Sequence, residues 1–206
     1  LFTRKLQQQG LRPLLANLSG ATETAAALDM LLQYSVDGVI VASSTLPQSF
    51  IAGCRAAGLP LVHAFGRVRA SRGIAVAGVD NVAGGRLAAA TLVERGYRRI
   101  AFLGGPETAT STIDRLAGLT SELTKHGLTP QRAIYGNSYA HETGRVLMHA
   151  LLERDAFDAV FCGDDILAIG GLDACIENGI KVPEQLGIIG FNDIAILSNE
   201  KKRINL

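Results

Sequence analysis

The sequence predicts an α/β protein of two similar lobes, each a parallel sheet flanked by helices, with a ligand cleft between the lobes. Three observations lead to this prediction. Short apolar runs alternate with longer helical runs, the short runs are apolar on both faces, and the alternation is repeated once along the chain. Strands that are apolar on both faces are typical of parallel sheets covered by helices on each side. Strand–helix alternation is the sequence pattern of such sheets.

The predicted strands are short and rich in Val, Ile and Ala, and helical runs lie between them. The strands are expected at residues 14–18, 38–42, 60–65, 74–79, 100–103, 133–135, 159–162 and 187–191. The helices are expected at residues 1–9, 21–33, 47–57, 82–95, 113–125, 142–153 and 165–178. A glycine follows five of these helical runs, where a left-handed C-cap is expected: Gly10, Gly58, Gly96, Gly127 and Gly179.

An internal repeat divides the chain. The stretch from Gln9, QGLRPLLANL, matches the stretch from His126, HGLTPQRAIY, and each is followed by helix, strand, helix and a Gly-to-Pro turn. The ordinary monotony of βαβ folds is the alternative explanation. Taken as two lobes, the repeat assigns residues 1–98 to the N-terminal lobe and 99–193 to the second, with 194–206 a tail or a return crossover. In the second lobe a strand and a loop precede the matching helix, so we expect a strand and a loop upstream of Leu1.

Composition limits the possible functions. Hydrophobic residues make up 48% and charged residues 19%, which suits a packed core rather than disorder. The net charge of +1, the 5% of aromatic residues and the absence of Trp argue against a nucleic-acid surface on this chain. No apolar run is long enough to span a bilayer. Three cysteines without a C-x-x-C pair are typical of buried side chains in a reducing compartment, which predicts a cytoplasmic protein.

Polar residues after the predicted strands are the candidate ligand contacts, because ligands bind beyond the carboxyl ends of parallel strands. Thr110 belongs to a hydroxyl-rich run before the helix at 113–125, where a helix cap by Ser111 or Thr112 is the structural alternative. Arg115 is expected in the first turn of that helix, where a cation opposes the helix dipole, so a partner explains its placement better.

Four more candidates follow other strands. Asp165 is placed to cap the helix after it, which leaves Asp164 available to ligand hydroxyls or amines. Tyr139 can stack on a ligand or simply pack, and Asn192 follows the last predicted strand. Ser43 begins a Ser-Ser-Thr run that is also ordinary turn chemistry.

Other chemistry finds little support. Asp80-Asn81 precedes a long helix and is expected to cap it. The paired carboxylates Asp164-Asp165 also raise the possibility of acid–base catalysis or a metal, but adjacent side chains seldom point the same way. The sequence contains no dinucleotide fingerprint, no Walker A loop, no G-x-S-x-G elbow and no histidines at metal-ligand spacing. We therefore expect no enzyme activity, no cofactor and no metal.

Read in order, several segments resemble the effector-binding domain of LacI/GalR-type transcription regulators. The resemblance extends over nearly the whole chain, and it depends on the order and spacing of the motifs rather than on any one of them. It is carried by VDN at 79–81, GYRRIAFLGGP at 96–106, DRLAGL at 114–119, FCGDDILAIG at 161–170 and VPEQLGIIGFND at 182–193.

The resemblance implies a periplasmic-binding-protein-like fold, a small effector such as a sugar, a sugar acid or a purine, and a homodimer. It also implies operator DNA as a partner, through a helix-turn-helix headpiece absent from this chain, and no membrane partner. By position, Arg115 resembles the arginine that clamps the effector in the family, and Tyr139 its stacking aromatic. Asp164 falls at the Asn or Asp of the "NDxxAxG" segment, and Asn192 at the first Asp of "GFDD".

Two departures from the family pattern bear on these expectations. Asn192 replaces a carboxylate, which favours a sugar acid, while Asp164 restores a negative group nearby. Residues 198–206 do not match the family's return crossover. A periplasmic sugar-binding protein of an ABC transporter is the alternative of the same fold, and an enzyme on a doubly wound sheet is a further one.

Overall fold

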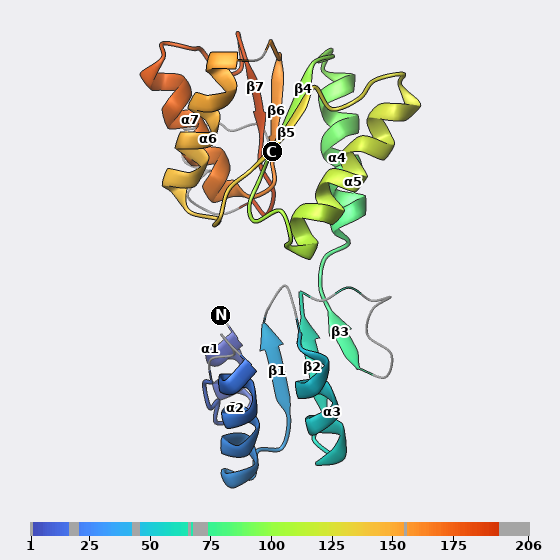
Figure 1. The fold of residues 1–206 in the computed structure, drawn as a ribbon, viewed down its shortest axis with the longest axis vertical. Helices are drawn as coiled ribbons and strands as arrows, with labels where there is room; N and C mark the ends of the chain where they lie inside the picture. Colours follow the sequence, from blue (N-terminus) through green and yellow to red (C-terminus); the bar gives the residue numbers. More distant parts are fainter. Residues whose placement is uncertain are drawn as a thin grey trace. The chain divides into compact units, whose positions relative to one another are not determined.

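Contacts divide the chain into two compact units, Leu1–Gly78 (unit 1) and Val79–Leu206 (unit 2), each described here by itself. The computed structural model describes residues 2–16, 21–42, 46–65, 67, 74–154 and 156–193. Figure 1 follows the elements along the chain from blue to red.

Unit 1 is built on a parallel sheet with the strand order β1-β2-β3. Its small core is a cluster made of Ala27, Leu31, Val41, Phe50 and Cys54. Its elements are α1 (Phe2–Gln8), α2 (Ala21–Gln33), β1 (Val39–Ala42), α3 (Gln48–Ala56), β2 (Leu61–Ala64) and β3 (Ala75–Ala77).

Unit 2 is built on a parallel sheet with the strand order β5-β4-β6-β7. Figure 1 shows this sheet between two helix pairs, α4 with α5 and α6 with α7. Its elements are α4 (Asn81–Glu94), β4 (Ile100–Gly104), α5 (Thr110–Lys125), β5 (Arg132–Tyr135), α6 (His141–Arg154), β6 (Ala159–Cys162), α7 (Asp165–Glu177) and β7 (Gly187–Ile189).

The central strands of unit 2 supply both of its cores, because successive side chains point to opposite faces of a sheet. On β4, Ile100 and Phe102 belong to the cluster with α4 and α5, whereas Ala101 and Leu103 belong to the cluster with α6 and α7. Every residue of β4 and β6 is buried. The expectation of strands apolar on both faces, covered by helices on each side, is confirmed for this sheet.

Glycines allow the paired helices of unit 2 to touch through their backbones. A Cβ on Gly118 of α5 would lie 2.2 Å from the carbonyl oxygen of Val82 in α4. A Cβ on Gly144 of α6 would lie 2.2 Å from the carbonyl oxygen of Leu167 in α7. No side chain fits at these distances, so glycine is required at both crossings.

Most predicted elements are present, within a few residues of their expected ends. The five glycines expected to end helices all have positive φ, between 67° at Gly58 and 95° at Gly96. The strand predicted at 14–18 is wrong over its described part, because residues 14–16 form no regular structure and Leu15 is 81% exposed. Residues 17–18 lie outside the described residues.

The lobe boundary expected at residue 98 stays a prediction, and the compact units of the structure divide after Gly78. The reason is that α4 packs along α5 and contributes buried residues to a core cluster of unit 2. The predicted tail at 194–206 lies outside the described residues. The strand and loop expected upstream of Leu1 stay a prediction.

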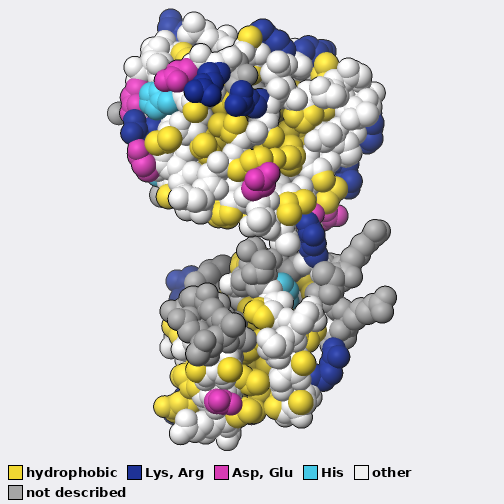
Figure 2. Space-filling view, viewed as in Figure 1, with side chains coloured by type: hydrophobic (Ala, Val, Ile, Leu, Met, Phe, Trp, Pro, Cys, Tyr) yellow, Lys and Arg dark blue, Asp and Glu magenta, His cyan; other side chains and the backbone are white. Residues whose placement is uncertain are grey.

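The outer side of the α6–α7 pair is polar. Arg145 donates to Glu142 and Glu177, and His149 Nε2 lies 2.7 Å from Glu177 Oε2. Figure 2 shows acidic, basic and histidine side chains gathered over these two helices. Among the helices of the described ranges, none has the length and apolar character needed to cross a membrane.

Candidate functional site

The candidate site in unit 2 lies where β4, β6 and β7 end. These strands are parallel, so their carboxyl ends share one edge of the sheet. The loop from β4 leads to Thr110, the first residue of α5, whereas Asp164 and Asn192 lie two and three residues after the ends of β6 and β7. This edge is where ligands bind in parallel α/β sheets.

Arg115 lies at this edge, is only 8% exposed, and is held by three contacts. Its Nε donates to Asn81 Oδ1 at 2.9 Å, and its Nη1 donates to the carbonyl oxygen of Gly163. Its guanidinium carbon lies 3.6 Å from the centre of the Phe191 ring, a cation–π contact. α5 begins at Thr110, so Arg115 lies beyond the first turn, and the helix-dipole argument for its placement is wrong.

Neighbouring groups keep Arg115 charged in this setting. Burial lowers the pKa of its guanidinium, and Tyr139, Asp164 and Asp165 oppose that shift. A guanidinium starts from so high a pKa that it remains a cation in the folded protein. The site therefore contains a fixed, largely buried positive charge.

Asp164 caps α7, so the expectation that Asp165 caps this helix is wrong. Its Oδ1 accepts from the backbone N–H of Ile166 at 2.9 Å, and its Oδ2 accepts from Asn192 Nδ2 at 3.0 Å. Burial raises the pKa of the Asp164 carboxyl, while the Ile166 and Asn192 hydrogen bonds and the charge of Arg115 oppose the rise. Each carboxylate oxygen keeps a lone pair for a further donor.

Asp165 is fully buried and holds the backbone that leads from β7 into the site. Its Oδ1 accepts from the backbone N–H of Phe191 at 2.6 Å, so it fixes the chain where β7 ends. Asn192 follows with φ 112°, a backbone conformation that asparagine tolerates better than most residues. The sequence did not reveal this role, because the partner lies 26 positions away.

Tyr139 is tied to the start of α5. Its hydroxyl lies 2.9 Å from both Ser111 Oγ and Thr112 Oγ1. Its ring packs over Gly105, where a Cβ would lie 2.3 Å from Tyr139 Cε1. The expected side-chain cap by Ser111 or Thr112 is wrong: Ala109 is the N-cap residue and forms no side-chain cap.

The structure thus brings Arg115, Tyr139, Asp164 and Asn192 to one edge of the sheet, with Thr110 at the start of α5. Ser43 lies outside the described residues. The residues that sequence reasoning missed are Asn81, Asp165 and Phe191. Phe191 has a signal in the sequence at Gly84, where only glycine leaves room for the phenylalanine ring. A Cβ at position 84 would lie 2.3 Å from Phe191 Cε2.

A hollow lies on another side of α5. It has a volume of about 570 Å³ and is lined by residues that include Ile113, Ala117 and Thr120. These positions recur at helical spacing away from the face that carries Arg115 and Gly118. The hollow therefore takes no part in the candidate site.

Chemically, the site offers a guanidinium, a carboxylate, an amide and hydroxyl groups. Such a set suits a ligand that has both donors and acceptors. Within the described ranges, no three His, Cys, Asp or Glu side chains gather in a way that could hold a metal ion.

Comparisons with known proteins agree with this architecture. Residues 89–200 match the family model of a periplasmic binding protein-like domain. The chain is similar to the HTH-type transcriptional repressor PurR of Klebsiella pneumoniae, with 32% identity over 193 residues, 91% of this chain and 56% of that protein. It thus spans little more than half of this curated relative.

Two solved structures from Escherichia coli are also similar. One is the transcriptional repressor AscG, with 31% identity, a TM-score of 0.81, and coverage of 94% of this chain and 72% of that one. The other is a sugar-binding transcriptional regulator of the LacI family complexed with phosphate. It has 31% identity, a TM-score of 0.78, and coverage of 95% of this chain and 71% of that one.

Proposed function

The chain belongs to the LacI family of transcriptional regulators, and we propose that it is the domain with which a longer regulator senses a small molecule. The observation that carries the proposal is the fixed Arg115 cation beside Asp164 at the strand ends of unit 2. The relatives of this chain are transcriptional regulators, so no enzyme activity is proposed for it.

Arg115 keeps hydrogen-bond donors for a ligand, because the protein does not use all of them. Its two hydrogen bonds use Nε and Nη1, and Nη2 forms none with the part of the chain that the structure describes. The unused N–H groups lie in the fixed plane of the guanidinium, which suits a carboxylate, a carbonyl or a pair of hydroxyls. We assign Arg115 the main polar contact with the effector.

The other candidates complete the proposed contacts. Asp164 retains lone pairs for ligand hydroxyls or amines, and Asn192 donates to Asp164 until a ligand competes for that amide. Tyr139 and Thr110 lie at the border of the site, beside the start of α5. Ser43 is proposed as a contact from unit 1 on the sequence pattern alone.

The proposed effector is a sugar, a sugar acid or a purine-like molecule. Asn192 stands where the family has a carboxylate, which favours a sugar acid, while Asp164 beside Arg115 balances the charge. One relative is by its name sugar-binding.

The regulation proposed for the whole protein is ligand-linked DNA binding. A homodimer would bind operator DNA in the cytoplasm through helix-turn-helix headpieces outside this chain, and the effector would shift the affinity by binding one state more tightly. A periplasmic sugar-binding protein of an ABC transporter is the second candidate. The names of the relatives favour the regulator.

A thermal-shift screen of the purified chain tests the proposal. The probes are sodium gluconate, D-glucose, D-glucose 6-phosphate and hypoxanthine, since a molecule that binds only the folded state raises Tm. Arg115→Ala should weaken binding of any active probe by at least about tenfold, because a charge-assisted hydrogen bond is lost. Asp164→Asn should weaken it too while keeping an N-cap side chain.

The matched control is Arg154→Ala, which removes an exposed arginine from the last turn of α6. Binding should be unchanged in this variant. A probe that binds wild type and Arg115→Ala equally well would place the effector elsewhere.

A further inference from the structure

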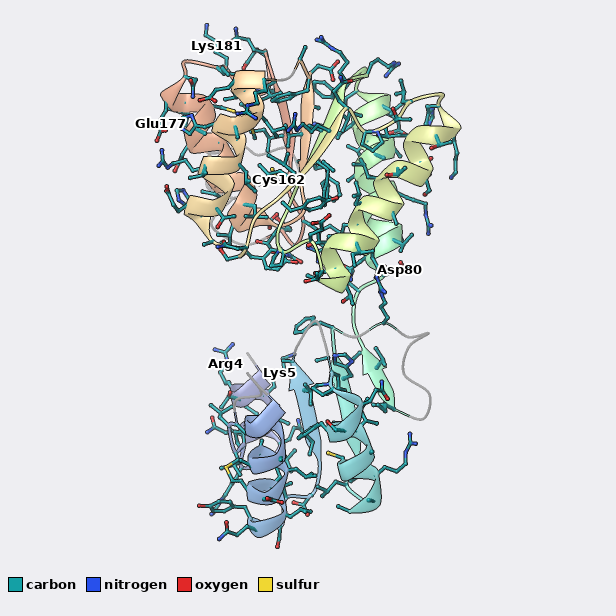
Figure 3. The ribbon with its side chains drawn as sticks, viewed as in Figure 1. Arg4, Lys5, Asp80, Cys162, Glu177 and Lys181 are labelled. Carbon is teal, nitrogen blue, oxygen red and sulfur yellow. The ribbon has the colours of Figure 1, made fainter. Side chains whose placement is uncertain are left out.

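Two adjacent residues at the start of α4 have different partners. Asp80 is the N-cap, and its Oδ1 accepts from the backbone N–H of Ala83 at 2.8 Å. Figure 3 labels Asp80 where α4 begins. Asn81, the next residue, accepts the Arg115 Nε–H instead, at 2.9 Å. The sequence pattern assigned both residues to capping, but only the aspartate caps.

Asn81 is the side chain that orients the Arg115 fork. In the described part of the chain, the other hydrogen bond of Arg115 goes to a backbone carbonyl, and its third contact is the face of the Phe191 ring. A ring face limits the tilt of a guanidinium but leaves it free to turn in its own plane. The Nη1 bond to the Gly163 carbonyl alone would still act as a pivot, and the second bond, from Nε to Asn81, fixes the in-plane orientation and leaves the Nη2 edge for a ligand.

The packing of α4 keeps Asn81 in place. Positions 81, 84 and 85 lie on one face of the helix, since residues three and four apart are neighbours. Gly84 receives the Phe191 ring, and a Cβ on Gly85 would lie 2.1 Å from the carbonyl oxygen of Arg115. The same face of α4 therefore meets the backbone, the guanidinium and the ring partner of Arg115.

We propose that Asn81 is a positioning residue, which holds Arg115 in the orientation that it needs to bind the effector. The proposal rests on the function proposed above for Arg115. The Arg115 side chain is already ordered in the free protein, so less conformational entropy is lost when a ligand binds.

The first test needs no ligand. The exchange of the Arg115 Nε–H with water is measured by ¹⁵N NMR on the 206-residue chain, and the signal is assigned by its loss in Arg115→Lys. Asn81→Ala should speed the exchange by at least about tenfold, because a hydrogen bond to a charged group is removed. Asn81→Asp keeps an acceptor at the same reach and should restore slow exchange. Asn81→Ser, too short to reach Nε, replaces Asn81→Ala if that variant does not fold.

Asp80→Ala is the matched control. It removes the cap of the same helix and should lower Tm, yet leave the Arg115 Nε–H slow to exchange. A purely structural role for Asn81 gives the opposite pattern, in which exchange follows Tm in both variants. That pattern, or slow exchange in Asn81→Ala, overturns the proposal.

The second test repeats the probe screen with these variants. A probe that raises Tm of wild type should bind Asn81→Ala about tenfold more weakly and Asp80→Ala about equally. Equal binding to wild type and Asn81→Ala also overturns the proposal. If wild type binds none of the probes, the proposed function loses its support, whereas the exchange measurement still decides whether Asn81 positions Arg115.

Discussion

β1 and β6 hold matching places in the repeat, yet their burial differs. The β1 residues Val39–Ala42 read VIVA, and only Val41 is buried, whereas Ile40 is 45% exposed. The β6 residues Ala159–Cys162 read AVFC, and all of them are 0% exposed. β6 lies between β4 and β7, whereas β1 is the last strand of its sheet among the described residues. Neighbours, rather than apolar sequence, decide the burial of a strand.

The same contrast extends to the cores. Unit 1 has one small buried cluster among its described residues, whereas unit 2 has a larger one on each face of its sheet. Since buried apolar area is the main source of stability, unit 2 should be the more stable part. Three measurements test this comparison.

The largest expected effect is that of Phe161→Ala in β6. Phe161 is fully buried and contacts Phe102, with ring centroids 5.5 Å apart. Its loss should lower the free energy of unfolding of unit 2 by about 3–5 kcal/mol, measured by calorimetry. The control, Phe50→Ala, should cost less and affect only the unit 1 transition, because a small cluster relaxes more easily. Equal losses would remove the proposed difference between the units.

Thiol labelling gives the next largest effect. Cys54, Cys162 and Cys175 are all 0% exposed. Burial raises the pKa of the Cys54 and Cys162 thiols and raises that of Cys175 to about 11, so each reacts only after its unit opens. Figure 3 labels Cys162 within the sheet of unit 2.

If unit 1 opens more readily, Cys54 should react with iodoacetamide roughly a hundredfold faster than Cys162 in native buffer, followed by mass spectrometry. In concentrated urea the three rates should become similar. Similar rates in native buffer would mean that the two units open together.

The smallest effect concerns the helix crossings. Gly118→Ala should destabilise unit 2 by about 1–3 kcal/mol, because the new Cβ meets the backbone of α4. Gly53→Ala is the matched change in unit 1, where a Cβ would meet the end of the Leu28 side chain, which can move away. Urea denaturation should therefore show a smaller loss for Gly53→Ala. A larger loss there would mean that unit 1 is packed as rigidly as unit 2.

Local patterns in the sequence predicted the fold well, because helices, strands and C-cap glycines depend on residues close in the chain. The strand expected at 14–18 shows the limit of such patterns. Leu14 and Leu15 are apolar, but they are exposed, and residues 14–16 form no strand. A strand forms only where a neighbouring strand accepts it, and a sequence pattern does not reveal that neighbour.

The sequence predicted where the residues of the candidate site lie, but not which residues they contact. The sequence could not distinguish Asp164 from Asp165, since both are carboxylates at the start of one helix. Their roles depend on contacts from β7, with Asn192 and Phe191. Asn81 was hidden for the same reason, because its acceptor role depends on Arg115, 34 positions away.

Among the described residues β1 is the last strand of its sheet, and this place has a consequence for handling the 206-residue chain. An edge strand presents unpaired N–H and C=O groups that can template the strand of another molecule, and β1 lacks the charges and prolines that usually blunt such an edge. Concentrated solutions of this chain should therefore form β-rich aggregates that begin at unit 1. A lysine in place of the exposed Ile40 would be the natural first change to improve its solubility.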